Sequence, residues 1–223
     1  MLLEFFRWLS TDIQGLNVFN YISLRAVLAV ITSLLISFCL GGWFIRKLGE
    51  YSLGQYIRND GPEGHLIKSG TPTMGGGLIL ISIITSTLLW ADLSNSYVWL
   101  LLIVTSSFGL IGLIDDISKI QKKEADGLSA LQKFILQSII GIAVASYLYY
   151  SAGTPQETEL LIPFFKDLSL PLGALTFIIL SYLVVVGSSN AVNLTDGLDG
   201  LAIMPAVMVI SALGVFAYVE GNI

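Results

Sequence analysis

The chain alternates between long apolar stretches and short polar segments. Each apolar stretch is close to the roughly 17–25 residues that a helix needs to cross a bilayer. A segment inside a bilayer must satisfy its own backbone hydrogen bonds, so these stretches are predicted to be α-helices. The predicted fold is therefore all-α, that of a polytopic integral membrane protein. Its six transmembrane helices are expected at approximately Ala26–Ile45, Met74–Trp90, Val98–Ile114, Phe134–Tyr150, Leu172–Gly187 and Leu201–Val219.

Residues 1–20 differ from the apolar stretches, because the charged residues Glu4 and Arg7 lie among aromatic side chains. That mixture is typical of a short helix lying in the interfacial region of a membrane. We therefore divide the chain into an N-terminal interfacial segment, residues 1–20, and a transmembrane domain, residues 21–223.

Composition agrees with a membrane protein. Hydrophobic residues make up 54% of the chain and charged residues 12%, about half the share usual in soluble domains, and the mean hydropathy is +0.80. Trp43, Trp90 and Trp99 fall at predicted span ends, as in an aromatic belt. The single cysteine, Cys39, excludes an internal disulfide and is expected to be a small buried side chain.

Lysine and arginine residues concentrate between alternate spans. Residues 46–73 carry four of them and residues 115–133 carry four more, whereas the opposite side has three. The positive-inside rule places the two basic segments in the cytoplasm and the amino terminus outside. Alternation puts residues 188–200 on the cytoplasmic side as well.

Two adjacent aspartates, Asp115 and Asp116, directly follow an apolar run that contains no charge. Neighbouring carboxylates repel each other, and acidic side chains at a helix C-terminus face the negative end of the helix dipole. Neighbours on a helix project roughly 100° apart, so we expect different roles for the pair, one approaching phosphates and one held by a cation or lysine. A structural alternative is a salt-bridge cluster flanking the membrane. The candidates for compensating the pair are a divalent cation and the lysines Lys119, Lys122 and Lys123.

The segment before the second span carries the phrases NDGPEGH (59–65) and KSGTPTMGG (68–76). Free backbone N–H groups at a helix start, with glycines that allow close approach and Lys68 adding charge, are typical of an anion site. The alternative is a turn-rich connector whose glycines serve helix packing.

Polar residues recur every three positions in the segment NAVNLTDGLDG (190–200). Asn190, Asn193, Asp196 and Asp199 would lie near one another on a helical or 3₁₀ surface. Their amide and carboxylate oxygens could orient a nucleoside or hold a hard cation. The alternative is a helix cap between two spans, for which one such residue would suffice.

Taken together, NDGPEGH, KSGTPTMGG, the aspartate pair and NAVNLTDGLDGLA, in this order, resemble the phospho-N-acetylmuramoyl-pentapeptide transferases. These belong to the polyprenyl-phosphate N-acetylhexosamine-1-phosphate transferase superfamily, and the resemblance covers essentially the whole chain. It implies transfer of phospho-MurNAc-pentapeptide from UDP-MurNAc-pentapeptide to undecaprenyl phosphate, giving lipid I and UMP for peptidoglycan biosynthesis. It further implies Mg²⁺ as cofactor and a place in the bacterial inner membrane, with a periplasmic amino terminus.

The resemblance also assigns roles to individual residues. Asp115 and Asp116 match the aspartate pair that carries catalysis and metal binding, in which a carboxylate deprotonates the lipid phosphate. Lys68 matches a basic residue near the uridine pocket. No nucleic-acid partner is expected, and a homodimer is left open. The other substrate-binding residues expected are Lys119, Lys123, Lys133, Asn190, Asn193, Asp196 and Asp199.

Members of the family have ten spanning helices, whereas six are predicted up to Ile223. We therefore expect the chain to correspond to the amino-terminal portion of that fold, with a third metal-binding aspartate in the remaining portion. By itself, the 223-residue chain is expected to be inactive.

Two other functions are considered. A related enzyme could transfer GlcNAc-1-phosphate to a polyprenyl phosphate, but the TPTMGG and NDGPE phrases favour the muramoyl enzyme. A transporter would require ionisable residues in the middle of its spans, and none of the six predicted spans has one.

Overall fold

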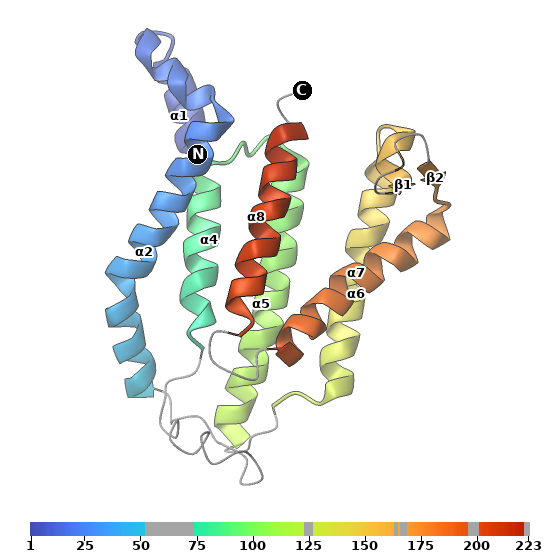
Figure 1. Cartoon of the computed structure of the whole chain (residues 1–223). Helices are drawn as coiled ribbons and strands as arrows, with labels where there is room; N and C mark the ends of the chain where they lie inside the picture. Colours follow the sequence, from blue (N-terminus) through green and yellow to red (C-terminus); the bar gives the residue numbers. More distant parts are fainter. Residues whose placement is uncertain (52–73, 123–126, 163–164, 166–168, 196–200, 221–223) are drawn as a thin grey trace. The chain divides into compact units, whose positions relative to one another are not determined.

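The computed structural model describes residues 1–51, 74–122, 127–162, 165, 169–195 and 201–220. Figure 1 shows that these residues are almost entirely helical. The chain divides into two compact units, Met1–Phe134 and Ile135–Ile223, and each is described by itself. The elements in order are α1 (Leu2–Leu9), η1 (Gln14–Asn20), α2 (Ile22–Tyr51), α4 (Gly76–Trp90), α5 (Ser96–Lys122), α6 (Ala130–Ser151), η2 (Pro155–Thr158), β1 (Glu159–Leu161), β2 (Ser169–Pro171), α7 (Ala174–Thr195) and α8 (Ile203–Glu220).

Every predicted span falls on a helix of the structure, which confirms the all-α membrane fold. Helices α2, α5, α6 and α7 are long and apolar enough to cross a membrane, whereas α4 and the apolar part of α8 are shorter. At 1.5 Å per residue, α4 is about 23 Å long, less than the roughly 30 Å of a hydrocarbon core.

Helices α2 and α4 pack side by side in the first unit and are joined by polar side chains (Figure 1). The hydroxyl of Ser37 donates to that of buried Ser82 at 3.1 Å, and the Trp90 indole N–H donates to Thr32 Oγ1 at 2.9 Å. Cys39 is exposed on α2, so the expectation that it is buried is wrong. A long apolar helix presents part of its surface outside the unit, and Cys39 lies on that part.

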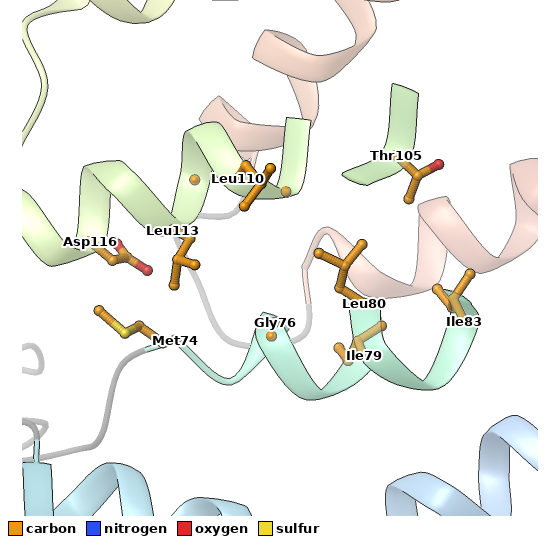
Figure 2. A pocket seen from close by; sticks show the side chains of 12 residues that line it. Met74, Gly76, Ile79, Leu80, Ile83, Thr105, Leu110, Leu113 and Asp116 are labelled. Atoms are coloured by element: carbon orange, nitrogen blue, oxygen red, sulfur yellow. The ribbon is translucent and has the colours of Figure 1, made fainter. Parts of the chain in front are cut away.

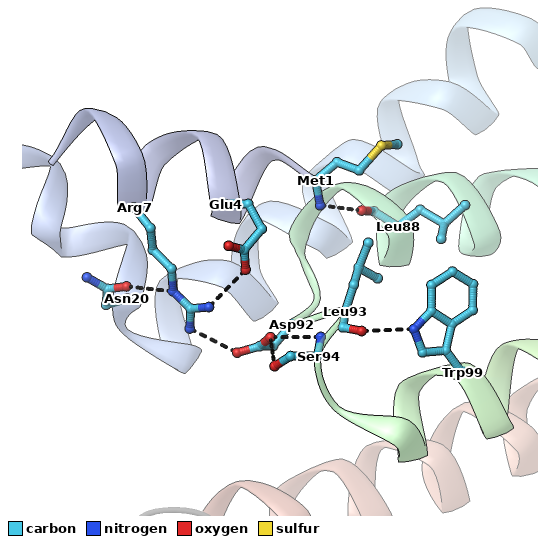
Figure 3. Close-up of polar contacts among 9 residues, drawn as sticks. All are labelled: Met1, Glu4, Arg7, Asn20, Leu88, Asp92, Leu93, Ser94 and Trp99. Atoms are coloured by element: carbon cyan, nitrogen blue, oxygen red, sulfur yellow. Dashed lines mark hydrogen bonds and ion pairs between the residues drawn. The ribbon is translucent and has the colours of Figure 1, made fainter.

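An ion-pair cluster fastens the N-terminal segment to the loop between α4 and α5 (Figure 3). Arg7 donates to Asp92 Oδ2 at 2.9 Å, to Glu4 at 3.0 Å and to Asn20 at 3.3 Å. Asp92 Oδ1 also accepts from the hydroxyl of Ser94 at 2.6 Å and from its backbone N–H at 3.1 Å. These hydrogen bonds from Ser94 and Arg7 lower the pKa of Asp92 to about 2.

Aromatic stacking supports the same attachment. The rings of Phe6 and Phe19 stack at 4.0 Å between centroids, and both rings lie about 6 Å from Trp90 at the end of α4. The amino terminus donates to the carbonyl of Leu88 at 3.0 Å (Figure 3). The short helix expected in residues 1–20 is therefore present as α1, and it is bound to α4.

The second unit contains the crossing helices α6 and α7 and a two-stranded antiparallel hairpin between them (Figure 1). Strand β1 pairs with β2 in the register Leu160↔Leu170. The hairpin is a small departure from the predicted all-helical pattern, because three-residue strands carry too little periodicity to be recognised in sequence.

The pKa of Asp92 makes the attachment of α1 sensitive to acid. The pKa of Asp92 in the folded protein, about 2, is below its reference value of 3.8. The stabilisation of the folded protein by the Asp92 carboxylate is therefore complete above about pH 4 and is lost as the pH falls towards 2. We expect Asp92→Asn to lower the melting temperature in detergent at pH 5. That deficit relative to the unsubstituted protein should shrink steadily as both are measured at lower pH.

Asp12→Asn is the matched control, because Asp12 is an exposed aspartate of the same N-terminal segment. Asp12→Asn also removes one negative charge, and it should leave the melting temperature unchanged at pH 5 and at pH 2.5. A deficit for Asp92→Asn that stayed constant from pH 5 to pH 2.5 would contradict the ion-pair explanation.

Candidate functional site

The aspartate pair lies inside α5, because the helix continues to Lys122. The expectation that the pair sits at a helix C-terminus is therefore wrong, and the unfavourable dipole effect is small there since it falls off within the last turn. The two neighbours have different surroundings, as their directions on the helix lead one to expect, while their different roles stay a prediction. Asp115 is buried, with its side chain 10% exposed, whereas the side chain of Asp116 is 33% exposed.

Both oxygens of Asp115 are engaged by the protein. Oδ2 lies 2.8 Å from the ammonium of Lys119 and 3.6 Å from that of Lys133. Oδ1 accepts a hydrogen bond from the backbone N–H of Leu128 at 2.9 Å. A buried carboxylate is stable only when it is paired in this way. Asp115 therefore holds two lysines and a loop in fixed positions.

The loop after α5 approaches Asp115 so closely that only glycine fits there. A Cβ at Gly127 would lie 2.6 Å from Asp115 Oδ1 and would also contact its carbonyl oxygen. Lys122, predicted to compensate the aspartates, instead donates to the carbonyl of Gly127 at 2.9 Å. This hydrogen bond holds the loop against α5, where the backbone N–H of Leu128 meets the carboxylate of Asp115.

A capping box begins α6 and places Lys133 in its first turns. The Ser129 hydroxyl accepts from the backbone N–H of Gln132 at 3.2 Å, and the Gln132 side chain accepts from the N–H of Ser129 at 3.1 Å. This reciprocal pair fixes the helix start. The Lys133 ammonium then reaches Asp115 from a second helix.

Asp116 faces a groove between α4 and α5 with a volume of about 420 Å³. Figure 2 shows Asp116 and Met74 at one end and Thr105 and Ile83 at the other. Apart from Asp116 and Thr105, the lining is apolar or glycine. Lys119 lies 3.2 Å from Asp116 Oδ1, so it contacts both aspartates.

Glycines line part of the groove. A Cβ on Gly76 or Gly112 would meet nothing within 4 Å, whereas at Gly109 it would lie 2.6 Å from Leu80. Met74, at the entrance to α4, has φ of 68°, in the left-handed region that favours glycine. Such strained residues cluster at functional sites.

Asn190 and Asn193 belong to the second unit, in the last turns of α7. The Asn190 amide donates to the Gln137 side chain at 2.7 Å and to the Val186 carbonyl at 2.9 Å. Asn193 is exposed. The meeting of this segment with the aspartate pair stays a prediction. Of the other candidate residues, Lys68, Lys123, Asp196 and Asp199 lie outside the described residues.

The described residues provide carboxylates for a metal but no complete ligand set. Within them, no group of three or more His, Cys, Asp or Glu side chains could hold a metal ion. Mg²⁺ is commonly held by one or two carboxylates, with substrate phosphates and water completing its octahedron. Because both oxygens of Asp115 are engaged, Asp116 fits that role better.

The family model described as "Glycosyl transferase family 4" matches residues 98–223, more than half of the chain. The chain belongs to glycosyl transferase family 4. This family contains phospho-N-acetylmuramoyl-pentapeptide transferases and polyprenyl-phosphate GlcNAc-1-phosphate transferases. The protein is therefore a polyprenyl-phosphate sugar-1-phosphate transferase, and its lipid acceptor lies in the membrane. The match includes the aspartate pair and the segment with Asn190 and Asn193.

Membership of glycosyl transferase family 4 supports the transferase and not the transporter. Sequence reasoning missed the backbone groups at Gly127 and Leu128, since nothing in a sequence shows which N–H will meet a carboxylate. It also missed Gln137, although an amide inside an otherwise apolar helix is a recognisable signal.

The different surroundings of the two aspartates predict different effects on stability. Asp115→Asn would leave Lys119 and Lys133 without their shared partner, so we expect a loss of about 1–3 kcal/mol. Asp116→Asn, at the more exposed carboxylate, should change stability by less than about 0.5 kcal/mol. Unfolding of both variants in detergent measures this difference. Equal losses for the two variants would contradict the assignment of Asp115 as the anchoring carboxylate.

Proposed function

We propose that the protein transfers phospho-MurNAc-pentapeptide from UDP-MurNAc-pentapeptide to undecaprenyl phosphate, giving lipid I and UMP. The observation that carries this proposal is the cluster of Asp115, Asp116, Lys119 and Lys133 at one end of the α4–α5 groove. The phrases NDGPEGH and TPTMGG favour the muramoyl sugar over GlcNAc. The reaction takes place at the cytoplasmic face of a bacterial inner membrane, where the soluble nucleotide meets the lipid.

The chemistry requires several negative charges to come together. An oxygen of the acceptor phosphate attacks the β-phosphorus of the UDP-sugar, and the bond from that phosphorus to the UMP oxygen breaks. Preorganised cations lower the barrier by offsetting the charge that accumulates on the phosphates. Lys119 and Lys133 are held in place by Asp115, a residue of the protein itself. The protein therefore does not have to reorganise them during the reaction.

The two aspartates divide the work. Asp115 orients the lysines, since its oxygens are already engaged. Asp116 is the more exposed carboxylate, and it faces the groove. It is placed to accept a remaining proton from the acceptor phosphate. The same carboxylate would hold Mg²⁺, which supplies further neutralisation of phosphate charge when bound.

We place the hydrocarbon chain of the acceptor in the groove between α4 and α5. The acceptor is an amphiphile with one phosphate, and the groove is apolar along its length with a carboxylate and a lysine at one end. A chain lying there would bring its phosphate to Asp116 and Lys119. The alternative occupant is another helix, because glycines also line helix–helix contacts.

The donor is tested by comparing two substrates with the full-length protein in detergent. We expect UMP release with UDP-MurNAc-pentapeptide and undecaprenyl phosphate, and little with UDP-GlcNAc. Chelation of divalent cations should abolish turnover, and added Mg²⁺ should restore it. Transfer from UDP-GlcNAc alone would replace the proposal by the related GlcNAc-1-phosphate enzyme.

The groove is tested by filling it. Gly112→Leu adds a side chain where the described structure has open space, so folding should be retained. We expect the KM for undecaprenyl phosphate to rise about tenfold, equivalent to 1.4 kcal/mol of lost binding, while the KM for the nucleotide sugar is unchanged. Gly214→Leu is the matched control, since Gly214 of α8 also meets nothing within 4 Å and is not one of the residues that line the groove.

Normal acceptor kinetics in folded Gly112→Leu would exclude the lipid from the groove. Loss of folding in Gly112→Leu but not in Gly214→Leu would indicate that another helix occupies it instead.

A further inference from the structure

Gln137 is a buried amide inside the apolar helix α6. It is 4% exposed, and its neighbours along the helix are mostly hydrophobic. A buried amide is costly unless it is hydrogen-bonded. Its oxygen accepts from the Asn190 side chain at 2.7 Å, a short bond that joins α6 to α7.

Both amide hydrogens of Asn190 are used within the protein. One is donated to Gln137, and the other to the carbonyl of Val186, one turn earlier in the same helix, at 2.9 Å. The side chain is therefore held in one orientation. Its amide group serves to join the two helices, which leaves only its oxygen for a ligand.

The contacts between α6 and α7 lie within a short region of each helix. A Cβ at Gly141 would lie 2.8 Å from Val186, so the helices approach closely there. The hydroxyls of Ser138 and Tyr182 are 3.0 Å apart. Asn190 lies nearer the end of α7 than Tyr182 and Val186, the other residues of that helix in these contacts.

The end of α7 beyond Asn190 is exposed up to Thr195. Asn193 lies in this part, about 4.5 Å further along the helix axis than Asn190. Residues 191–195 are exposed throughout, and of the three contacts described above, the hydrogen bond at Asn190 lies nearest to Asn193 along α7.

We propose that Gln137 is a positioning residue for the transfer reaction, acting through Asn190 to fix the end of α7 that carries Asn193. This inference rests on the proposed function and on the prediction from the sequence that Asn193 is a substrate-binding residue able to orient the nucleoside. Gln137 itself touches no substrate. Its loss should therefore weaken use of the nucleotide sugar and leave use of the lipid acceptor unchanged.

Three substitutions in the full-length protein separate positioning from simple stability. Gln137→Met keeps the size of the side chain but cannot accept the hydrogen bond. Gln137→Glu keeps an acceptor oxygen at the same distance along the side chain. Ser138→Ala removes the neighbouring hydrogen bond to Tyr182 from the same helix pair, and thus serves as a control for lost stability.

We expect Gln137→Met to lower kcat/KM for UDP-MurNAc-pentapeptide by up to about 100-fold, the loss that a misplacement of about 1 Å can cause. The KM for undecaprenyl phosphate should be unchanged. Gln137→Glu should retain activity within about threefold. Ser138→Ala should lower the melting temperature about as much as Gln137→Met while keeping normal kinetics.

Equal kinetic losses in Gln137→Met and Ser138→Ala, or a parallel rise in both KM values, would overturn the inference and make Gln137 a packing residue. If Gln137→Met does not fold, Gln137→Asn decides the question, because it stays polar but is one methylene too short to reach Asn190. Normal kinetics in that variant would also overturn the inference. An unsubstituted protein that transfers neither UDP-sugar would instead refute the proposed function.

Discussion

The burial of one negative charge, that of Asp115, organises the polar end of the first unit. A carboxylate removed from water must be compensated in full, and here two ammonium groups and one backbone N–H provide the compensation. Each partner comes from a different place: Lys119 from the same helix, Lys133 from the start of α6, and Leu128 from the connecting loop. The pairing therefore joins three segments around one side chain.

A second consequence is that the neighbouring carboxylate is left more accessible. Successive side chains on a helix point about 100° apart, so burying Asp115 turns Asp116 towards the groove. The contact of Lys119 with both aspartates links the buried carboxylate to the exposed one. In the second unit, the Gln137–Asn190 bond performs a similar task without charge, since it fixes one polar group in order to orient the next.

The fold was more predictable than the site. Apolar runs of spanning length have few alternatives in a bilayer, so each predicted span is a helix in the structure. The helix ends were less predictable, because α5 extends beyond its apolar run to Lys122 and carries the aspartates within it. Lys119 was one of three lysines expected to compensate the aspartates, and it is the one that lies three and four residues from them, where side chains are neighbours on a helix. The approach of Gly127 and the pairing of Gln137 depend on tertiary contacts that spacing does not reveal.

The shortness of α4 has a consequence for the membrane around it. A bilayer accommodates a helix shorter than its hydrocarbon core by thinning locally, at a cost of a fraction of a kcal/mol per Å of mismatch. Where α4 borders lipid and the bilayer thins to match it, the headgroup layer is drawn inward. A lipid alongside α4 then carries its phosphate closer to the bilayer centre than its neighbours do. The side chains that bind this phosphate therefore need to extend less far from the ends of their helices.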